Sequence, residues 1–415
     1  MVSCFGRMQP QQPISPRAAT VRTGATDAFE APDFYQIDDL LTPEQKLVRS
    51  AMRTFVKREI TPTIDDCAQR GEFPETIVPK FGQIGAFGPT LPVEVGGGGL
   101  DQISYGLMMQ EIERGDSALR STVSVQSSLV MYPIWAFGSD EQKAHYLPRL
   151  AKGELLGCFG LTEANHGSNP GGMESAFIER SDYYLLNGSK LWITNAPIAD
   201  IAIVWAKNEQ GKIRGLIVER GMEGFSTNDI ERKWSLRASR TGELIFQDVK
   251  VPKTNMLPDA IGLKAPLQCL DQARYGIAWG AVGAAMDCYE TARRYTLERI
   301  QFDKPIASFQ LVQKKLAEML TDITKAQLVC WRLGTLKNND AATTAQISMA
   351  KRDNVDMALR VARTCRQLLG GMGITGDYPI MRHMMNLESV ITYEGTHDIH
   401  LLILGEAITG IGAFK

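Results

Sequence analysis

The sequence predicts an α+β fold in which a helical region, a β-rich region and a second helical region follow one another. Helical periodicity runs to about residue 150, short β-rich runs follow residue 153, and long helical stretches follow residue 268. A chain of 415 residues is too long for one ordinary core, so two or three domains are expected. We divide the chain into a flexible tail (1–34), a helical domain (35–152), a β-domain (153–262) and a helical bundle (263–415).

The tail is rich in serine, threonine, proline and arginine, and its first acid is Asp27. This composition is typical of a disordered segment. A mitochondrial transit peptide has a similar composition, but the prolines would break its amphipathic helix, so we favour a plain tail.

The helical domain opens with a strong start signal, because Thr42 can cap a helix with Pro43 in its first turn and Gln45 three residues after the cap. Apolar residues then recur on one helical face, at Val48, Met52, Val56 and Ile60. Four glycines at 96–99 interrupt the helical segments and are typical of a loop.

Five β-rich runs separated by Gly, Asn and Asp predict a small antiparallel β-domain that ends near Leu257. The runs cover residues 183–186, 191–194, 201–205, 216–218 and 244–251. Three long helical stretches with short connections then predict an antiparallel bundle, and they cover residues 278–299, 310–336 and 341–369.

The composition of the chain argues against two classes of protein, those that bind nucleic acid and those that span a membrane. The net charge is -2 without a basic stripe, which argues against nucleic acid as a partner, and no apolar run approaches the ~18 residues of a membrane span. Cysteines are odd in number, widely scattered and without a CxxC pair, which predicts reduced core thiols in a reducing compartment. They are Cys4, Cys67, Cys158, Cys269, Cys288, Cys330 and Cys365.

One acid near the C-terminus stands out: Glu394 precedes Gly395 and lies between apolar residues 390–391 and 401–404. A carboxylate there is expected to be poorly solvated, which raises its pKa and makes it a better proton acceptor at neutral pH. Thr396 and Asp398 offer a hydroxyl and a carboxylate to a polar ligand. On spacing alone, a helix end with a solvated Glu394 is the simpler interpretation.

The segment Tyr393-Glu394-Gly395-Thr396 resembles the catalytic-base motif of the acyl-CoA dehydrogenase family, and the run to Gly410 resembles its glutaryl-CoA dehydrogenase branch. The resemblance extends from about residue 38 to residue 414. It implies an N-terminal helical domain, a middle antiparallel β-domain and a C-terminal four-helix bundle, usually in a homotetramer. It also implies that Glu394 removes the α-proton of an acyl thioester while the β-hydride passes to N5 of FAD. Electrons would then pass to an electron-transfer flavoprotein.

Residues 159–163 lead into a glycine-containing turn whose backbone amides suit anions and ring acceptors, or simply form a loop leaving the first domain. The resemblance places Phe159, Leu161 and Thr162 at the flavin. It places Gly167 and Ser168 at the pyrophosphate and at CoA.

Trp192 ends a β-run together with Thr194 and is either a core residue or a cover for the flavin ring. By resemblance, Trp192 covers the flavin and Thr194 faces N5. Asn169 stands where the family usually has aspartate, which makes capping of the preceding turn less certain.

A second group of cofactor residues is expected from a neighbouring subunit by resemblance. The group comprises Arg299, Phe302, Gln310, Gln367 and Gly371, while Thr396 and Asp398 join the cofactor site from their own loop. Residues 371–376 satisfy GxGxxG, but they follow a helical segment without a βαβ unit, so we reject a Rossmann site. A helix end whose amides approach a phosphate is the better interpretation.

Two Glu-x-x-His spacings, Glu163/His166 and Glu394/His397, mimic di-iron bundle proteins. That chemistry requires both pairs on helices, and the asparagine, glycine and proline around Glu163 put the first pair in a loop. We therefore expect no metal site.

Arg120 and Ser124 are four residues apart, on one face of a predicted helix, and together suit a bidentate carboxylate. The alternative is a salt bridge from Arg120 to Asp116, four residues earlier. Arg120, Ser124 and Glu113 align with the branch of the family that takes a dicarboxylic thioester. The resemblance adds Tyr393 to this substrate site and gives Ser168, Asp271 and Arg274 contacts to CoA.

The combined prediction is oxidative decarboxylation of glutaryl-CoA to crotonyl-CoA and CO2. Alternatives are a short-chain acyl-CoA dehydrogenase or oxidase, a glutaryl-CoA dehydrogenase that does not decarboxylate, and a non-catalytic flavin- or acyl-CoA-binding scaffold. We expect a bacterial cytoplasmic protein, with the mitochondrial matrix as the alternative compartment.

Overall fold

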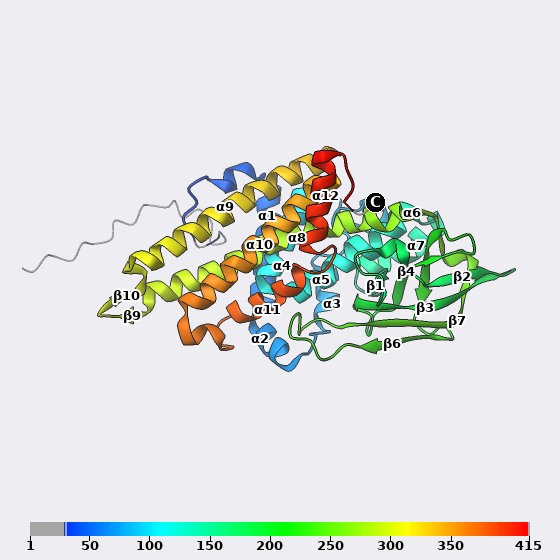
Figure 1. Ribbon diagram of the computed structural model, residues 1–415, viewed down its shortest axis with the longest axis horizontal. Helices are drawn as coiled ribbons and strands as arrows, with labels where there is room; N and C mark the ends of the chain where they lie inside the picture. The colour runs from blue at the N-terminus through cyan, green and yellow to red at the C-terminus, as the bar shows by residue number, and fades with distance from the viewer. Residues whose placement is uncertain (1–28, 30, 414–415) are drawn as a thin grey trace, which may run out of the picture.

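The computed structural model describes residues 29 and 31–413. Most of the tail predicted over 1–34 lies outside them, as does Cys4. Within that segment Phe29 and Ala31 pack against the helical core, and the Phe29 ring centroid is 5.8 Å from that of Tyr289. The molecule is elongated, with the helical bundle at one end and the sheet at the other (Figure 1).

The N-terminal domain is helical, as predicted. Thr42 and Gln45 form the predicted capping box at the start of α1. Two turns of π-helix, Val56–Ile60 and Val125–Met131, continue α1 and α5. The α-helices are α1 (Pro43–Phe55), α2 (Thr61–Arg70), α3 (Ile77–Gln83), α4 (Gln102–Gly115), α5 (Ser117–Ser124), α6 (Tyr132–Phe137) and α7 (Asp140–Ala151).

The middle domain is one sheet that is mostly antiparallel, although β1 and β2 each pair in parallel with β4. The main strand order is β6-β7-β3-β2-β4-β5-β8. The strands are β1 (Gly157–Gly160), β2 (Ala176–Glu179), β3 (Tyr183–Thr194), β4 (Ile201–Lys207), β5 (Ile213–Glu219), β6 (Phe225–Asp229), β7 (Thr241–Pro252) and β8 (Met256–Ile261).

Sequence reasoning divided β3 into two strands and missed β1, β2, β6 and β8. The division fell at Gly188, where the pairing register shifts and φ is 135°. Strand β1 has two glycines in four residues, and β8 contains Pro258 at the edge of the sheet, so both lack an ordinary strand signal.

The C-terminal region is built from long helices joined by short connections. Helix α8 begins at Lys264, before the predicted start at Ala278, and the small hairpin of β9 (Ile300–Gln301) and β10 (Lys304–Pro305) follows it. The helices are α8 (Lys264–Glu298), α9 (Gln310–Asn338), α10 (Thr344–Leu368), α11 (Ile380–Val390) and α12 (His397–Thr409).

Helix α8 joins the two helical regions because glycines let α4 approach it closely. A Cβ at Gly280 would lie 1.9 Å from Oε2 of Glu113, and one at Gly283 would lie 1.9 Å from the carbonyl oxygen of Gln110. No side chain fits at either position. One hydrophobic core therefore extends through both helical regions, and it brings Glu113 against α8.

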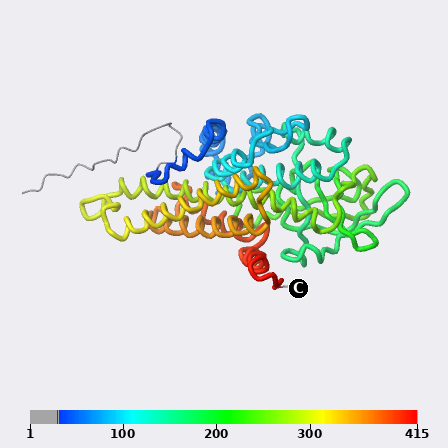
Figure 2. Tube along the Cα trace, turned by 90° about the horizontal axis from the view of Figure 1, so that it is seen from above, coloured from blue at the N-terminus to red at the C-terminus, as the bar shows by residue number. Residues whose placement is uncertain are grey.

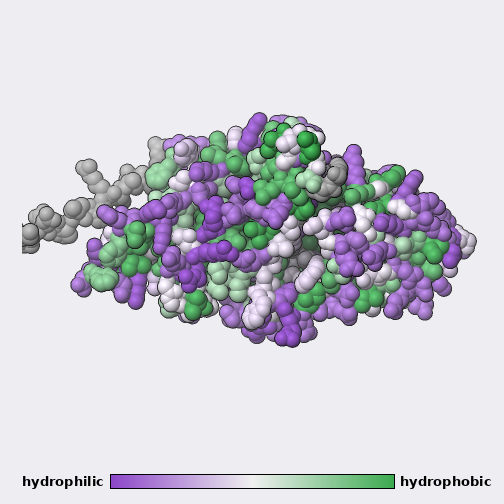
Figure 3. Space-filling view, viewed as in Figure 1, coloured by the Kyte–Doolittle hydropathy of each residue, from purple (hydrophilic) through white to green (hydrophobic). Residues whose placement is uncertain are grey.

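Helix α12 packs differently from the rest of the bundle. It stands out from the body of the molecule (Figure 2), and His400 is its one buried residue. Figure 3 shows apolar side chains gathered over it, where Leu401 is 44% exposed and Ile408 79% exposed. A single copy of the chain thus leaves much of this apolar helix uncovered.

The described cysteines are all free and buried: Cys67, Cys158, Cys269, Cys288, Cys330 and Cys365. Burial raises the pKa of the Cys158 thiol to about 12, which keeps it protonated and unreactive at neutral pH. Among the described residues, no helix combines the length and apolarity needed to cross a bilayer.

Candidate active site

The loop between α11 and α12 is held by cationic side chains at three consecutive carbonyl oxygens. Lys351 Nζ on α10 donates to the carbonyl oxygens of Tyr393 (3.0 Å) and Gly395 (2.9 Å). Arg274 Nε on α8 donates to the carbonyl oxygen between them, that of Glu394 (2.9 Å). Helices from two sides thereby fix the loop in the middle of the molecule (Figure 1).

The loop has a left-handed backbone at Glu394 (φ 53°) and at Gly395 (φ 92°). A Cβ at Gly395 would lie 2.9 Å from Nε2 of His400, so glycine is required there by space as well as by backbone angle. His400 is fully buried, and burial together with the charges of Lys351 and Arg274 lowers its pKa to about 3. A neutral imidazole therefore packs against the backbone of the loop at Gly395.

The Glu394 side chain is half-buried, and its Oε2 atom is held away from water. Among the described residues, Oε2 has no hydrogen-bond partner. Burial raises the pKa of Glu394 above its usual value, and the nearby charges of Arg120 and Lys351 offset only part of that effect. The solvated helix end that spacing alone favoured therefore does not describe Glu394.

Arg120 is completely buried on α5, and its partners are Glu113 and Tyr393. Its Nε atom donates to Oε2 of Glu113 at 2.6 Å, and Nη2 donates to the Tyr393 hydroxyl. Burial disfavours the charged guanidinium, but Glu113, Tyr393 and Glu394 together outweigh burial and raise the pKa of Arg120. A permanent positive charge thus lies beside the loop that carries Glu394.

The alternative pairing of Arg120 with Asp116 is wrong. Asp116 is the N-cap of α5, and its carbonyl oxygen accepts from the Arg120 amide (3.1 Å), but its side chain binds other groups. Its side chain accepts from the Ala118 amide (2.7 Å) and from Arg382 Nη1 (2.6 Å). The Asp116 carboxylate therefore caps α5 and forms an ion pair with α11, and it does not pair with the Arg120 side chain.

Several polar atoms around Arg120 are buried and have no hydrogen-bond partner within the described part of the chain. They are Nη1 of Arg120, Oε1 of Glu113, Oγ of Ser124 and Oε2 of Glu394. Leaving such atoms unpaired typically costs about 1–3 kcal/mol each, so a concentration of them calls for an explanation. A ligand carboxylate would pair the two donors among them, Nη1 of Arg120 and Oγ of Ser124.

The turn predicted to hold the flavin is fixed by a buried ion pair. Glu163 accepts from Lys190 Nζ (2.7 Å) and from the amides of Glu174 (2.6 Å) and Ser175 (2.9 Å). Burial opposes ionisation, but these bonds prevail and lower the pKa of Glu163 to about 2. Lys190 also donates to the Leu161 carbonyl oxygen (3.2 Å), so the ion pair sets the path of the turn.

The Glu163 ion pair argues against the di-iron alternative. Both Glu163 oxygens accept hydrogen bonds within a loop, so they are not available to a metal. Within residues 29 and 31–413, no group of three or more His, Cys, Asp or Glu side chains has the spacing of a metal site.

Trp192 lies at an irregularity of β3 with a left-handed backbone (φ 63°), and its indole is 58% exposed. It is therefore not the core residue of the alternative interpretation. Gly167 and Ser168 are exposed on the nearby turn, and Leu161 and Phe159 are buried beneath it. An uncovered indole beside exposed backbone amides fits a planar ring with an anionic extension.

Asn195 connects this part of the sheet to the helix that carries Arg120. Its Oδ1 accepts from the Thr122 hydroxyl on α5 (3.4 Å), and its Nδ2 donates to the Gly157 carbonyl oxygen on β1 (3.2 Å). Thr194, the preceding residue, ends β3 and is half-buried. The predicted substrate and flavin residues thus belong to one connected structure.

The cofactor residues predicted from a neighbouring subunit lie elsewhere. Arg299 and Phe302 are at the β9–β10 tip, at the end of the bundle opposite the sheet (Figure 1), and Phe302 is 86% exposed. Gln310, Gln367 and Gly371 are also exposed. Within one chain, this group and the Trp192 region do not meet.

The GxGxxG segment lies mostly in a 3-10 turn, Gly370–Ile374, that directly follows α10. No strand precedes it, in agreement with the rejected Rossmann interpretation.

Three further predicted residues surround the Glu394 loop. Asp271 accepts from Arg274 Nη1 (3.3 Å) and from the Thr344 hydroxyl (2.6 Å). Thr396 caps α12 by accepting from the Ile399 amide (3.3 Å), and Asp398 is exposed in the first turn of that helix. The Asn169 side chain, by contrast, forms no cap on the turn that follows it.

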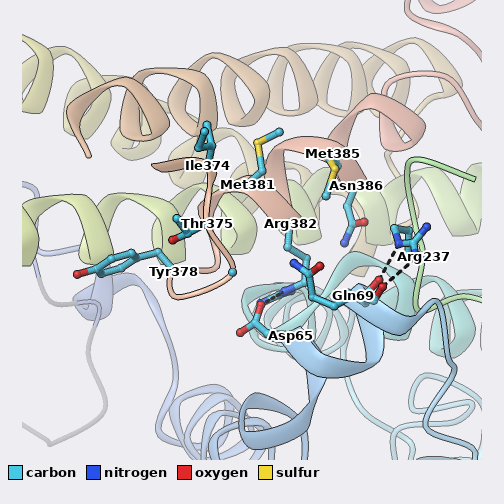
Figure 4. Close-up of a pocket in the computed structure, with 12 residues that line it drawn as sticks. Asp65, Gln69, Arg237, Ile374, Thr375, Tyr378, Met381, Arg382, Met385 and Asn386 are labelled. Atoms are coloured by element: carbon cyan, nitrogen blue, oxygen red, sulfur yellow. Dashed lines mark hydrogen bonds and ion pairs between the residues drawn. The ribbon is translucent and has the colours of Figure 1, made fainter. Parts of the chain in front are cut away.

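A separate pocket of about 60 Å³ lies between α2 and α11 (Figure 4). Its lining includes Asp65 and Arg382, which pair at 2.6 Å. Neither Glu394 nor Arg120 lines it. It is therefore distinct from the candidate active site.

Sequence reasoning missed Lys351, Lys190 and Gly280. Lys351 is 1% exposed on α10, and burial lowers its pKa to about 7. It follows Ala350 in an otherwise ordinary amphipathic stretch, so only its contacts 42 and 44 residues away identify it. Gly280 lies among alanines of α8, and its need for space appears only when Glu113 is placed against it.

Comparison with known proteins gives consistent matches along the chain. Models of the N-terminal, middle and C-terminal domains of acyl-CoA dehydrogenase match residues 42–154, 158–249 and 261–409. A short-chain specific acyl-CoA dehydrogenase of Clostridium acetobutylicum is 35% identical, over 90% of this chain and 100% of that protein.

Two solved structures are closer in sequence. The crystal structure of glutaryl-CoA dehydrogenase from Mycobacterium smegmatis is 48% identical, covers 91% of this chain and 98% of its own, and superposes with a TM-score of 0.90. A glutaryl-CoA dehydrogenase from the same organism in complex with FADH2 is 46% identical, covers 92% and 98%, and also has a TM-score of 0.90.

Proposed function

The chain belongs to the acyl-CoA dehydrogenase family, and we propose that it oxidises and decarboxylates glutaryl-CoA to crotonyl-CoA with FAD as its cofactor. The observation that carries the proposal is the buried guanidinium of Arg120, which keeps one unpaired N–H beside the Glu394 loop. An uncharged acyl chain has no use for a buried cation, because such a chain offers it no acceptor.

Recognition of the distal carboxylate is assigned to Arg120 and Ser124. Glu113 and Tyr393 occupy Nε and Nη2 of Arg120, which leaves Nη1 for the substrate. The unpaired Ser124 hydroxyl, one helical turn further along α5, supplies a second donor. Charge-assisted bonds of this kind are roughly twice as strong as neutral ones, so they select a dicarboxylic thioester over a plain one.

Bound FAD supplies the acceptor for the β-hydride. Leu161, Thr162, Trp192 and Thr194 are assigned to its ring, and Gly167 and Ser168 to its pyrophosphate side and to CoA. The residues at the bundle tip are assigned to the adenine side of a flavin bound mainly by another copy: Arg299, Phe302, Gln310, Gln367 and Gly371. This assignment requires at least a dimer, and we propose the homotetramer usual in the family.

Glu394 acts as the base that takes the α-proton at its unpaired Oε2. Its raised pKa makes it a better acceptor than a solvated carboxylate. The negative charge that develops on the thioester oxygen needs a hydrogen-bond donor, and the Glu394 backbone N–H is assigned that role. Asp271 and Arg274 are assigned to the CoA part of the substrate.

Decarboxylation follows from the product of the first step. Glutaconyl-CoA is vinylogous to a β-keto acid, so the bond to its carboxylate breaks with release of CO2 and leaves a dienolate. Glu394, now protonated, returns its proton to that dienolate to form crotonyl-CoA. An electron-transfer flavoprotein would then receive the electrons taken up by the bound cofactor.

The second candidate is a short-chain acyl-CoA dehydrogenase, which the Clostridium relative favours. The third is a glutaryl-CoA dehydrogenase that stops at glutaconyl-CoA. The decisive experiment mixes the holoenzyme anaerobically with glutaryl-CoA and follows flavin absorbance and released CO2 together. Bleaching with stoichiometric CO2 is expected. Bleaching without CO2 contradicts decarboxylation, and equal turnover of butyryl-CoA favours the short-chain enzyme.

A further inference from the structure

We propose that Lys351 is a positioning residue that aims the backbone N–H of Glu394 at the thioester oxygen. The inference rests on the proposed function, in which that N–H stabilises the developing oxyanion. It deepens the function by naming the side chain that sets the direction of the donor.

Peptide geometry links the Glu394 N–H to the Tyr393 carbonyl group. In a trans peptide, the C=O of one residue and the N–H of the next point in opposite directions. No cis bond occurs in the described chain, so the Tyr393 carbonyl and the Glu394 N–H are antiparallel. Lys351 holds that carbonyl from the α10 side at 3.0 Å. It thereby directs the Glu394 N–H away from α10.

The next two peptide groups of the loop are also held by cationic side chains. Arg274 binds the Glu394 carbonyl oxygen from α8, and Lys351 binds the Gly395 carbonyl oxygen at 2.9 Å. Three successive peptide planes are therefore fixed by two cations on different helices. Lys351 makes two of the three bonds, so its loss frees the plane before Glu394 and the plane after Gly395, while the plane between them keeps its bond to Arg274.

The backbone of the loop does not favour this conformation by itself. Glu394 has φ 53°, which residues other than glycine seldom adopt, and the neighbouring Gly395 has wide backbone freedom. Tertiary contacts must impose such a conformation. Lysine suits the task because its ammonium group has three donors and no acceptor, so one side chain reaches two carbonyl oxygens.

The burial of Lys351 gives a functional reason for its presence. Lys351 is 1% exposed, and among the described residues its ammonium group bonds only to these two carbonyl oxygens. The nearby charge of Glu394 attracts it, while Arg274 and Arg120 repel it. A methionine of similar length would fill the space without that cost. A lysine here is therefore explained by the bonds it makes to the loop.

The test compares Lys351→Met with Lys337→Met in the FAD-loaded enzyme. Lys337 is the control, because burial lowers its pKa as it lowers that of Lys351, while its half-buried ammonium group binds Gln272 and not the loop. Each variant is first checked for FAD content and thermal unfolding. Flavin reduction by saturating glutaryl-CoA is then measured anaerobically.

For Lys351→Met we expect a reduction rate roughly 100-fold lower, with the half-saturating substrate concentration little changed, because a misaimed donor weakens the transition state more than the ground state. Lys337→Met should match the wild type. A rate for Lys351→Met within threefold of the wild type overturns the proposal. A lower rate that is fully accounted for by lower FAD content or lower stability of the variant also overturns the proposal.

A second readout does not depend on turnover. A 3-ketoacyl-CoA forms an enolate on the enzyme, and the pH at which the enolate absorbance appears reports how well the site stabilises an oxyanion. That pH should rise in Lys351→Met and stay constant in Lys337→Met. An unchanged pH overturns the role of Lys351. If the methionine variant does not fold, Lys351→Gln, which keeps two N–H donors without the charge, should show a smaller rise, and no rise overturns the proposal.

The proposed function and the role of Lys351 can be tested separately. A wild-type enzyme that no acyl-CoA reduces contradicts the proposed function. A wild-type enzyme that is reduced, with a Lys351→Met variant that behaves identically, contradicts only the role of Lys351.

Discussion

The Glu394 loop and the bundle tip bear predicted site residues in opposite physical settings. Around Glu394, the charged groups Arg120, Glu113 and Lys351 are almost completely buried and paired within one chain. At the tip, Phe302 is 86% exposed, and Arg299 is exposed beside it. One region is complete in a single copy, apart from a ligand, whereas the other lies open to solvent.

The difference separates the two tasks of the proposed enzyme. Proton transfer and carboxylate recognition require groups fixed relative to one another in a dry site, which a single core provides. Holding the distant end of a long cofactor requires only surface groups, and these can come from another copy. The apolar side chains left uncovered on α12 agree with an assembly of more than one chain.

The largest expected effect comes from removing the carboxylate in the buried region. Glu394→Gln should slow flavin reduction by roughly 10³-fold, within the range for loss of a general base, while FAD stays bound. Anaerobic stopped-flow absorbance measures the rate. Glu388→Gln on α11 is the control, since its carboxylate pairs with Arg363 at the surface. A Glu394→Gln rate within tenfold of the wild type would remove Glu394 from the mechanism.

The next effect concerns selectivity. Arg120→Met should lower kcat/KM for glutaryl-CoA roughly 100-fold more than for butyryl-CoA, because only the former loses charge-assisted bonds. The variant leaves Glu113 buried without its cation, so Arg120→Met/Glu113→Gln is needed to separate lost recognition from lost stability. If both variants lower kcat/KM for glutaryl-CoA and for butyryl-CoA by the same factor, Arg120 does not bind the substrate carboxylate.

A smaller effect is expected at the tip. Phe302→Ala should weaken FAD binding about tenfold, which is the size of one lost aromatic stacking contact. The unfolding temperature of the FAD-free chain should not change, since the ring is exposed within one copy. Equilibrium titration of the FAD-free chain with FAD measures the effect, and Leu47→Ala on the exposed side of α1 serves as the control. Unchanged FAD affinity would mean that the tip does not reach a cofactor.

The smallest effect is a stability difference with a defined sign. The folded state raises the pKa of Glu394, so the stability that comes from binding a proton there is present at low pH and lost as pH rises through the raised value. Glu394→Gln avoids that loss. Its unfolding temperature should exceed that of the wild type by on the order of 1–3 °C at pH 8, with the gap closing toward pH 4. A gap that widens on acidification would contradict a raised pKa.

Local sequence signals determined much of this protein. The capping box at Thr42 and Gln45, the order of helical and β-rich regions, and the short motif around Glu394 are all local patterns, and the family relationship follows from such motifs. Local sequence patterns did not predict the short, glycine-rich strand β1. They also divided β3 into two strands, because the pairing of β3 is irregular at Gly188.

Tertiary structure alone decided which charges meet. Helical spacing offered Asp116 as the partner of Arg120, but Arg382 takes Asp116 from 266 residues away, and Arg120 turns to Glu113 and to Tyr393, 273 residues later. Lys351 is bound to the Glu394 loop across 42 residues. Periodicity reports only which residues share a face. A buried charge bonds to whatever group the packing of other elements brings within reach, and that packing is a property of the whole chain.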